Sequence, residues 1–318
     1  MGSIAIDTGL IPPTTQRAII AETGERVCIR EDTPLASLRS DEILVHTEAL
    51  SLNPSDTKMR GDFVTPGAML GCDYAGTVIA RGSAVAGVEI GDRVCGAQYK
   101  MNPKRPIRAA FEEYNIPTGP FWLKLPDSIT TEGGATYSAA IGTAGLALKL
   151  LGLPLPDAPV QKPAYVLVYG GGTATATIAI QLLKLNNLRY ALDCITTVES
   201  TAPCFAVLGR AGGKYVSLDP FEQRVATRKI VKTDWTLGPS LFGEGCVWPE
   251  PYARPPSKEL LQYGERPWAV AQRLLDEGRL KHRPVRQLEG GLEQVLVGME
   301  MVRRGELKGE KCVVKLAR

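Results

Sequence analysis

The string NPSDTK, Asn53–Lys58, puts two hydroxyls, a carboxylate and an ammonium on one short turn of this 318-residue chain. Such a cluster can hydrogen-bond the nicotinamide or the ribose of a dinucleotide at a domain interface. A structural role is the alternative, because Ser or Asp at this place also caps a short helix. We take Lys58 as the candidate catalytic residue, since its ammonium could orient a carbonyl or relay a proton; an exposed lysine without such a role is the alternative.

A second chemical stretch runs from the apolar segment Tyr165–Tyr169 through three glycines, Gly170–Gly172, into the small residues Thr173–Ala176. This pattern predicts strand, turn and helix, and the backbone amides of such a turn can approach a pyrophosphate. The spacing departs from the strict glycine fingerprint, because Thr175 or Ala176 stands where the third glycine is expected. A purely structural glycine turn is the alternative.

Asp193 lies near the distance at which a dinucleotide fold presents its ribose-binding residue. We do not assign it that role, because the predicted helix Thr173–Leu185 leads through Asn186 and Asn187 directly into the predicted strand Tyr190–Thr196. No 2′-phosphate site of Ser, Lys, Arg or Tyr is apparent in the sequence either.

The elements that must position these residues change in type along the chain. Residues 17–98 alternate in the manner of β-strands, whereas α/β alternation begins after Thr131 and predicts a parallel sheet. Residues 100–110 are basic and contain prolines, which predicts a surface loop. The other predicted elements are strands at Phe111–Tyr114, Phe121–Leu125, Lys214–Ser217, Val231–Thr236 and Glu310–Leu316, and helices at Gly133–Leu151, Glu199–Leu208, Leu260–Gly278 and Leu292–Arg304.

Composition excludes several classes of protein. With 37 Lys and Arg against 34 Asp and Glu, the net charge of +3 is too small to indicate nucleic acid or an anionic membrane as the main partner. Seven cysteines without a CxxC pair predict reduced thiols in a cytoplasmic protein. Only two histidines are present, so we expect no zinc. We expect no signal peptide and no membrane span, because the longest apolar stretch, Ala139–Leu155, contains Lys149 and Pro154.

Taken in order, the motifs resemble the medium-chain dehydrogenase/reductase superfamily, in its zinc-free quinone and enoyl reductase branch. The resemblance is carried by Asn53–Asp56, GCDYAGTV at 71–78, GDRV at 91–94, the glycine turn and GEKCVVKL at 309–316. Further strings are similar to fungal trans-acting enoyl reductases: NPSDTKMRG at 53–61, TAGLALKLLGLPLP at 143–156, NNLRYALDCIT at 186–196 and TRKIVKTDWTLGPSLFGEG at 227–245.

This resemblance implies an α/β protein, with a GroES-like β-barrel catalytic domain at 1–136 and 274–318 and a Rossmann-type domain at 137–273. It implies NADPH as cofactor and, as partner, an iterative polyketide synthase or a hybrid with a peptide synthetase; we expect a monomer. The implied cofactor-binding residues are Ser55, Asp56, Thr57, Lys58, Gly172, Thr173, Ala174, Thr175, Leu218, Asp219, Val313 and Val314. The implied acyl-binding residues are Thr143, Ala144, Gly145, Leu146, Ala147, Leu148, Lys149, Leu150, Gly238, Pro239, Ser240, Leu241 and Phe242.

The chain departs from this family after Leu185. Family members carry roughly forty residues between the first Rossmann helix and the NNLRYALDC strand, which supply the second and third strands and the usual 2′-phosphate contacts. Here Leu185 runs straight into Asn186. We therefore expect a shortened Rossmann domain with exposed apolar edges, and NADP preference rests on family membership alone.

The reaction that the family implies is hydride transfer to the β-carbon of an enoyl thioester, followed by protonation at the α-carbon. Backbone amides near Thr143 or the Lys58 ammonium could stabilise the thioester oxygen, and water or Lys58 could supply the proton. Two other functions stay open: a free-standing reductase of quinones or small enones, and a non-catalytic partner that binds a synthase without holding cofactor.

Overall fold

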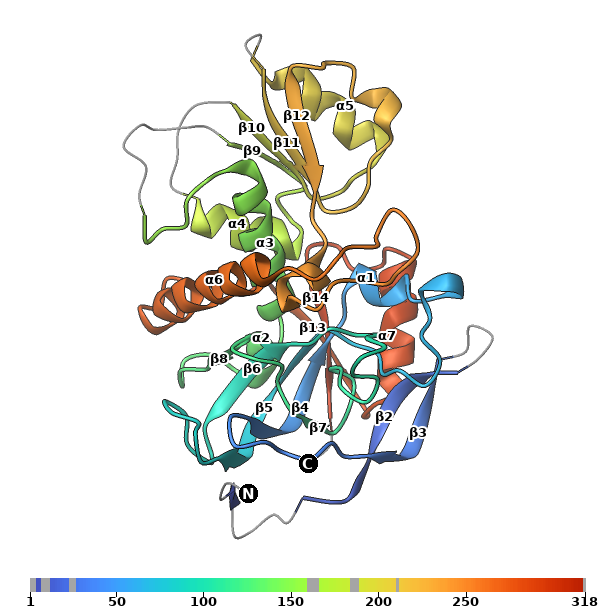
Figure 1. Ribbon diagram of the computed structural model, residues 1–318, viewed down its shortest axis with the longest axis vertical. Coiled ribbons are helices and arrows are strands. Elements are labelled where there is room, and N and C mark those ends of the chain that lie inside the picture. Colours follow the sequence, from blue (N-terminus) through green and yellow to red (C-terminus); the bar gives the residue numbers. More distant parts are fainter. Residues whose placement is uncertain are drawn as a thin grey trace. The chain divides into compact units, whose positions relative to one another are not determined.

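The computed structural model describes residues 4–6, 12–22, 27–158, 166–183, 189–209 and 212–316. The chain forms two compact units (Figure 1). The β unit comprises residues 1–139, 246–249 and 281–318, and the α/β unit comprises residues 140–245 and 250–280. The predicted domain boundaries, after residues 136 and 273, stay predictions. In the structure the main changes from one unit to the other fall after residues 139 and 280. Residues 246–249, which return briefly to the β unit, were not part of the predicted division.

A sheet of eight strands forms the β unit. Its order is β13-β14-β4-β5-β6-β8, with β1 beside β5 and β7 beside β4, while β2 and β3 form a separate antiparallel pair. Short helices α1 and α2, the 3-10 turn η1 and helix α7 connect the strands. The bounds are β1 Ile4–Ile6, β2 Thr15–Ala21, β3 Val27–Pro34, β4 Ile43–Ser51, α1 Pro54–Thr57, η1 Gly61–Phe63, β5 Asp73–Gly82, β6 Arg93–Ala97, β7 Tyr114–Asn115, β8 Trp122–Lys124, α2 Thr131–Gly134, β13 Val285–Glu289, α7 Glu293–Arg303 and β14 Lys311–Lys315.

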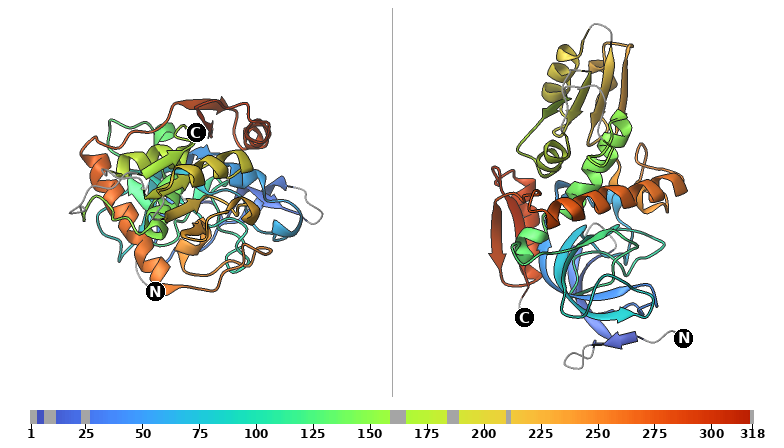
Figure 2. Two further views of the ribbon diagram at one scale, coloured as in Figure 1. Left: turned by 90° about the horizontal axis from the view of Figure 1, so that it is seen from above. Right: turned by 90° about the vertical axis from the view of Figure 1, so that its left-hand side faces the viewer.

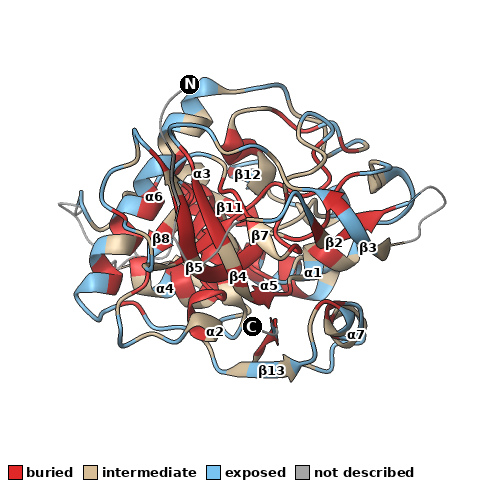
Figure 3. Cartoon of the chain, turned by 90° about the horizontal axis from the view of Figure 1, so that it is seen from below, coloured by how far each residue is buried: buried red, intermediate tan, exposed pale blue. Residues whose placement is uncertain are grey.

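Strands β4 and β5 are the buried centre of this sheet (Figure 3). They lie so close that a Cβ on Gly76 would fall 1.9 Å from the His46 carbonyl oxygen. Their register pairs Ser51 with Asp73, and Ser51 also pairs with Val313 of β14. Three strands therefore meet where the chain enters the turn at Asn53.

The α/β unit contains a parallel sheet of four strands in the order β12-β11-β10-β9. Helix α5 packs along these strands (Figure 2). The bounds are α3 Ser138–Leu151, β9 Val166–Tyr169, α4 Ala174–Leu182, β10 Tyr190–Asp193, α5 Val198–Val207, β11 Gly213–Ser217, η2 Gln223–Val225, β12 Val231–Trp235, η3 Gly238–Phe242 and α6 Lys258–Asp276.

This sheet is shorter than a complete dinucleotide-binding sheet, whose six strands follow the order 3-2-1-4-5-6. Strands β9 to β12 take the places of strands 1, 4, 5 and 6, and the described residues contain no counterpart of strands 2 and 3. Strand β9 consequently lies at an edge, and its four residues are half-buried or exposed, whereas three of the four residues of β10 are buried. The shortened Rossmann domain is thus confirmed, although the Leu185–Asn186 junction lies outside the described residues.

Several elements differ from the sequence predictions. The predicted helix Gly133–Leu151 is two helices, α2 and α3, interrupted between Gly134 and Ser138. The predicted strand Phe111–Tyr114 is reduced to the two residues of β7 and a single bridge from Glu112 to Ala18. Strand β13 was not predicted; it lies at the edge of the sheet, parallel to β14, and most of its residues are exposed.

Helix α3 packs against α6 within the α/β unit through glycine. A Cβ on Gly145 would lie 2.4 Å from Cγ of Pro267, and the Tyr263 hydroxyl donates to the Gly145 carbonyl at 2.9 Å. Any side chain at this position would force the two helices apart.

We predict that Gly145→Ala destabilises the chain by about 1–3 kcal/mol, because it overpacks the contact between α3 and α6. Urea unfolding followed by circular dichroism measures the change. Gly238→Ala is the matched control, because its added Cβ meets nothing within 4 Å. Equal unfolding midpoints for the two variants would contradict this packing.

Candidate active site

The turn Asn53–Lys58, which we call the polar turn, is held by local hydrogen bonds around α1. The Asn53 backbone amide donates to Oδ2 of Asp56 at 2.7 Å, and Oγ1 of Thr57 donates to the Pro54 carbonyl at 2.7 Å. Asp56 is fully buried, whereas Lys58 at the end of the helix is exposed. The capping alternative therefore holds for Asp56, while its part in cofactor binding stays a prediction.

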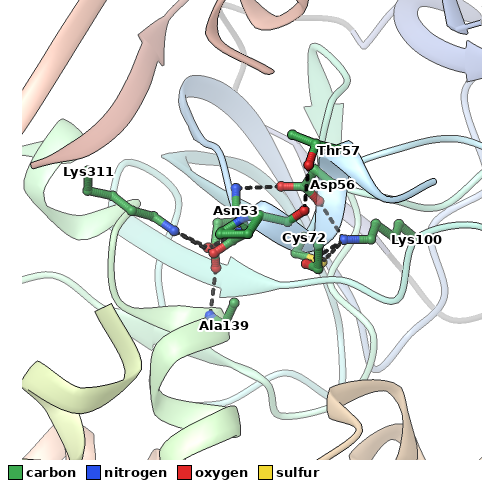
Figure 4. Close-up of polar contacts among 10 residues, drawn as sticks. Asn53, Asp56, Thr57, Cys72, Lys100, Ala139 and Lys311 are labelled. Atoms are coloured by element: carbon green, nitrogen blue, oxygen red, sulfur yellow. Dashed lines mark hydrogen bonds and ion pairs between the residues drawn. The ribbon is translucent and has the colours of Figure 1, made fainter. Parts of the chain in front are cut away.

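A buried lysine, Lys100, contacts this turn through two of its side chains. The sequence analysis did not single it out. The Nζ atom of Lys100 lies 2.6 Å from Oδ1 of Asp56, 2.8 Å from Oγ of Ser55 and 3.3 Å from Sγ of Cys72 (Figure 4). Lys100 is 1% exposed, and Met101, Asn102, Ala109 and Ala110 are also buried, so the predicted surface loop at 100–110 is wrong at both of its ends. Tyr99 and Met101, both apolar and buried, were the sequence signal for this burial.

The surroundings of Lys100 favour the charged form of its side chain. Burial by itself would lower the pKa of Lys100, but the Asp56 carboxylate and the hydrogen bonds around Nζ raise it above its ordinary value. Burial raises the pKa of the Cys72 thiol to about 12, so that Cys72 is a neutral thiol beside the ammonium. Lys100 is thus a charged donor enclosed by protein.

A second buried pair adjoins the first through Asn53. Nδ2 of Asn53 donates to Oδ2 of Asp73 at 2.8 Å. Nζ of Lys311 donates to Oδ1 of Asn53 and lies 3.7 Å from the Asp73 carboxylate (Figure 4). The backbone amide of Ala139 donates to Oδ1 of Asp73 at 2.6 Å. Burial raises the pKa of Asp73 and lowers that of Lys311, and each partner's charge opposes the other's shift. Two lysines and two aspartates therefore hold the polar turn rigidly in the β unit.

The predicted cofactor residues Val313 and Val314 lie in β14, beside this cluster. Both are fully buried, and Val313 and Val314 pair with Ser51 and Leu50 of β4. The structure brings them next to the strand that enters the polar turn. Their contact with a cofactor stays a prediction.

The glycine turn and α4 form the expected strand–turn–helix unit in the α/β unit. Gly170 has a φ of 80°, and a Cβ on Gly172 would meet nothing within 4 Å. Thr173 caps the helix by accepting from the Ala176 amide at 3.2 Å. The Thr173 amide donates to the Gly170 carbonyl at 2.8 Å. The first amides of a helix lack intrahelical partners, so the amides of Gly172, Ala174 and Thr175 are backbone donors of the kind that a pyrophosphate requires.

Asp193 serves the fold. Its carboxylate is fully buried and accepts hydrogen bonds from the hydroxyls of Ser200 at 2.7 Å and Tyr215 at 2.9 Å and from the backbone amides of Ile195 and Thr196, both at 3.0 Å. These contacts occupy the carboxylate and join β10 to α5. A ribose contact by Asp193 is therefore excluded in this arrangement, as the sequence analysis expected.

Leu218 and Asp219 follow the end of β11, at the same carboxyl edge of the parallel sheet as the glycine turn. The Leu218 amide donates to the Asp193 carbonyl at 3.2 Å, and Oδ1 of Asp219 accepts from the Tyr252 hydroxyl at 2.6 Å. Ligands of open parallel sheets bind at this edge. The predicted cofactor role of both residues is untested.

The two predicted acyl-binding segments lie together within the α/β unit. A Cβ on Gly142 of α3 would lie 3.4 Å from Cδ1 of Leu241 in η3 and 2.5 Å from the Trp268 ring of α6. Much of each segment is buried, namely Ala144, Leu146, Ala147, Leu148, Ser240, Leu241 and Phe242. Thr143, Lys149, Leu150, Gly238 and Pro239 remain partly exposed, and acyl binding by these segments stays a prediction.

The described residues contain neither a candidate metal cluster nor a membrane-spanning helix. No group of three or more His, Cys, Asp and Glu side chains in that part of the chain is arranged to hold a metal ion. None of its helices is long and apolar enough to cross a membrane.

Comparison with known proteins identifies the relatives of the chain. Residues 39–120 match the alcohol dehydrogenase GroES-like domain. The enoyl reductase component of lovastatin nonaketide synthase from Aspergillus terreus is 48% identical, with 98% of this chain and 99% of the relative covered. A dehydrogenase from Monascus pilosus is 49% identical over 96% and 98% of the two chains, and a trans-enoyl reductase from Petromyces alliaceus is 38% identical over 95% and 97%.

Solved structures show the same fold at low identity. An alcohol dehydrogenase superfamily protein from Novosphingobium aromaticivorans matches with a TM-score of 0.71 at 18% identity, covering 95% of this chain and all of the other. The CurK enoyl reductase matches with a TM-score of 0.69 at 14% identity, covering 96% and 100%.

The alignment with the Aspergillus terreus protein spans 358 positions against the 318 residues of this chain, so at least forty of its positions have no partner here. This agrees with the two strands that the described sheet lacks. Identity of this level over nearly the whole of both chains shows that the protein belongs to the fungal trans-enoyl reductases of the medium-chain dehydrogenase/reductase superfamily, as a member with a shortened Rossmann domain.

Proposed function

We propose that this chain reduces the α,β-double bond of a polyketide thioester in trans, using NADPH, while the substrate is carried on an iterative polyketide synthase or a synthase–peptide synthetase hybrid. The observation that carries the proposal is the 48% identity to the enoyl reductase component of a nonaketide synthase, which extends over nearly the whole chain. The relatives are oxidoreductases, and their class implies a nicotinamide cofactor.

The described residues fit such a cofactor. When bound, NADPH supplies the hydride for the β-carbon. The amides of Gly172, Ala174 and Thr175 at the start of α4 would hold its pyrophosphate. Lys58 donates to the thioester oxygen and so stabilises the charge that develops there.

The proposal is tested by a substrate panel that contains a carrier-bound enoyl thioester, a small free enone and a quinone. We expect NADPH oxidation with the carrier-bound thioester to exceed that with the two free substrates by at least tenfold in kcat/KM. Turnover of the quinone alone would instead identify a free-standing quinone reductase.

The non-catalytic alternative has one observation in its favour, the open edge of the sheet at β9. It predicts that the chain binds the synthase's carrier domain and binds neither NADPH nor NADH. A pull-down with the loaded carrier domain, paired with cofactor titration, separates this outcome from the reductase.

We predict that Gly172→Asp weakens NADPH binding at least tenfold, because it places a carboxylate where the pyrophosphate binds. The space around Gly172 is open, so the melting temperature of the variant should stay within about 2 °C of the unmodified chain. Fluorescence titration measures the dissociation constant, and Gly172→Ala separates the effect of charge from that of the glycine. Unchanged affinity in the Asp variant would remove the turn from the site.

We predict that Lys58→Ala lowers kcat with the enoyl thioester by about 10²-fold, the scale of one lost oxyanion donor. Steady-state kinetics test this, with Lys308→Ala as the control for loss of an exposed lysine. If turnover of the Lys58 variant matches the control, Lys58 has no part in the mechanism.

A further inference from the structure

We propose that Ser55 delivers the proton that completes the reduction, and that Lys100 is the positioning residue that supplies it. Nζ of Lys100 donates to Oγ of Ser55 at 2.8 Å. This hydrogen bond uses a lone pair of Oγ, so the O–H of Ser55 points away from the lysine. The inference rests on the proposed enoyl reduction and assigns its acid, which the sequence left between water and Lys58.

Among the hydroxyls of the polar turn, only that of Ser55 is available as a donor. The Thr57 hydroxyl already donates to the Pro54 carbonyl. In the described part of the chain, the Ser55 hydroxyl has no hydrogen-bond partner besides Lys100, and the residue is half-buried rather than enclosed. Its proton can therefore be given to a ligand.

Lys100 has one route by which a proton can leave. The ammonium is 1% exposed, and its Nζ contacts Asp56, Cys72 and Ser55. Asp56 is held by the ion pair and by the Asn53 amide, and Cys72 is a neutral thiol. Of these three described neighbours, the Ser55 hydroxyl is the one that is neither enclosed in the ion pair nor a thiol, and it can accept a proton and pass one on.

Neither histidine competes for this role. The His46 ring packs against Tyr114, and Nδ1 of His282 contacts the Arg283 carbonyl while its ring packs on Tyr137. Both rings are therefore engaged elsewhere in the β unit, away from the polar turn.

The step balances as a simple proton transfer. After the β-carbon has gained its hydride, the Ser55 O–H bond breaks and a C–H bond forms at the α-carbon of the enolate. A proton moves from Nζ of Lys100 to Oγ of Ser55, which leaves a neutral amine beside Asp56. Water then returns a proton to Lys100 through Ser55, and this restores the ammonium.

The first test needs neither cofactor nor substrate. Ser55→Thr keeps the hydroxyl, whereas Ser55→Val has the same shape without it. In the full chain labelled with ¹⁵N-lysine, NMR measures how fast the Nζ protons of Lys100 exchange with water. The Nζ signal of Lys100 is assigned through its side-chain carbons. We expect exchange in the Val variant to be at least fivefold slower than in the Thr variant. The ammonium of Lys311, buried beside Asp73, is the internal reference and should exchange equally in both.

Equal or faster exchange of the Lys100 protons in the Val variant would overturn the relay. Thr65→Val is a further control, because it removes a hydroxyl bonded to the Met101 carbonyl, adjacent to Lys100 but outside the relay. This variant should exchange at the rate of the unmodified chain.

The second test uses turnover. We expect Ser55→Val to lower kcat with the enoyl thioester, measured at saturating NADPH, about 10²-fold, the lower end of general-acid contributions. Ser55→Thr should retain at least a tenth of kcat. Equal kcat in the Val and Thr variants would overturn the proposal. If the unmodified chain shows no turnover, the proposed function fails, and the exchange experiment still decides the relay.

Discussion

The buried ion pair between Lys100 and Asp56 is the interaction on which the architecture of the β-unit site depends. It joins a loop after β6 to α1, and Asn53 links it to a second pair, Asp73 and Lys311. Removing one partner of such a pair leaves an unpaired charge in protein and typically costs about 3–5 kcal/mol. The polar turn is therefore held in one geometry, which suits a hydroxyl and an ammonium that must meet a ligand without rearrangement.

Sequence patterns predicted much of this arrangement because they are local. The glycine turn before α4, the strand β11 and the cap formed by Asp56 all follow from residues within a few positions of each other. The exclusion of Asp193 as a ribose ligand followed in the same way, from the short distance between α4 and β10.

The remaining features depend on contacts between residues far apart in the chain. Lys100 lies 44 residues from Asp56, and a basic residue in a proline-containing stretch is ordinarily solvated. Strand β13 forms only because β14 lies beside it, since most of its side chains are exposed and carry no apolar pattern. The burial of Gly145 against Pro267 depends on the tertiary packing of α6, which helical periodicity in α3 does not reveal.

The shortened sheet leaves one edge unpaired and apolar side chains near it exposed. Strand β9 has a partner on one side only, and Ile180 and Ile195, close to the glycine turn, are 49% and 46% exposed. In a six-stranded sheet two further strands would follow on that side. The glycine turn that we propose as the pyrophosphate site nonetheless lies between β9 and α4, and both elements are present.

The most direct measurement is a calorimetric titration of the purified, unmodified chain with NADPH. Thermal melting with and without NADPH is recorded in parallel. Saturable binding accompanied by a rise in melting temperature is the result predicted here, because a ligand that binds only the folded state stabilises it. Absence of binding, or absence of a cooperative melt, would contradict the account and identify the chain as a form of the reductase that cannot hold its cofactor.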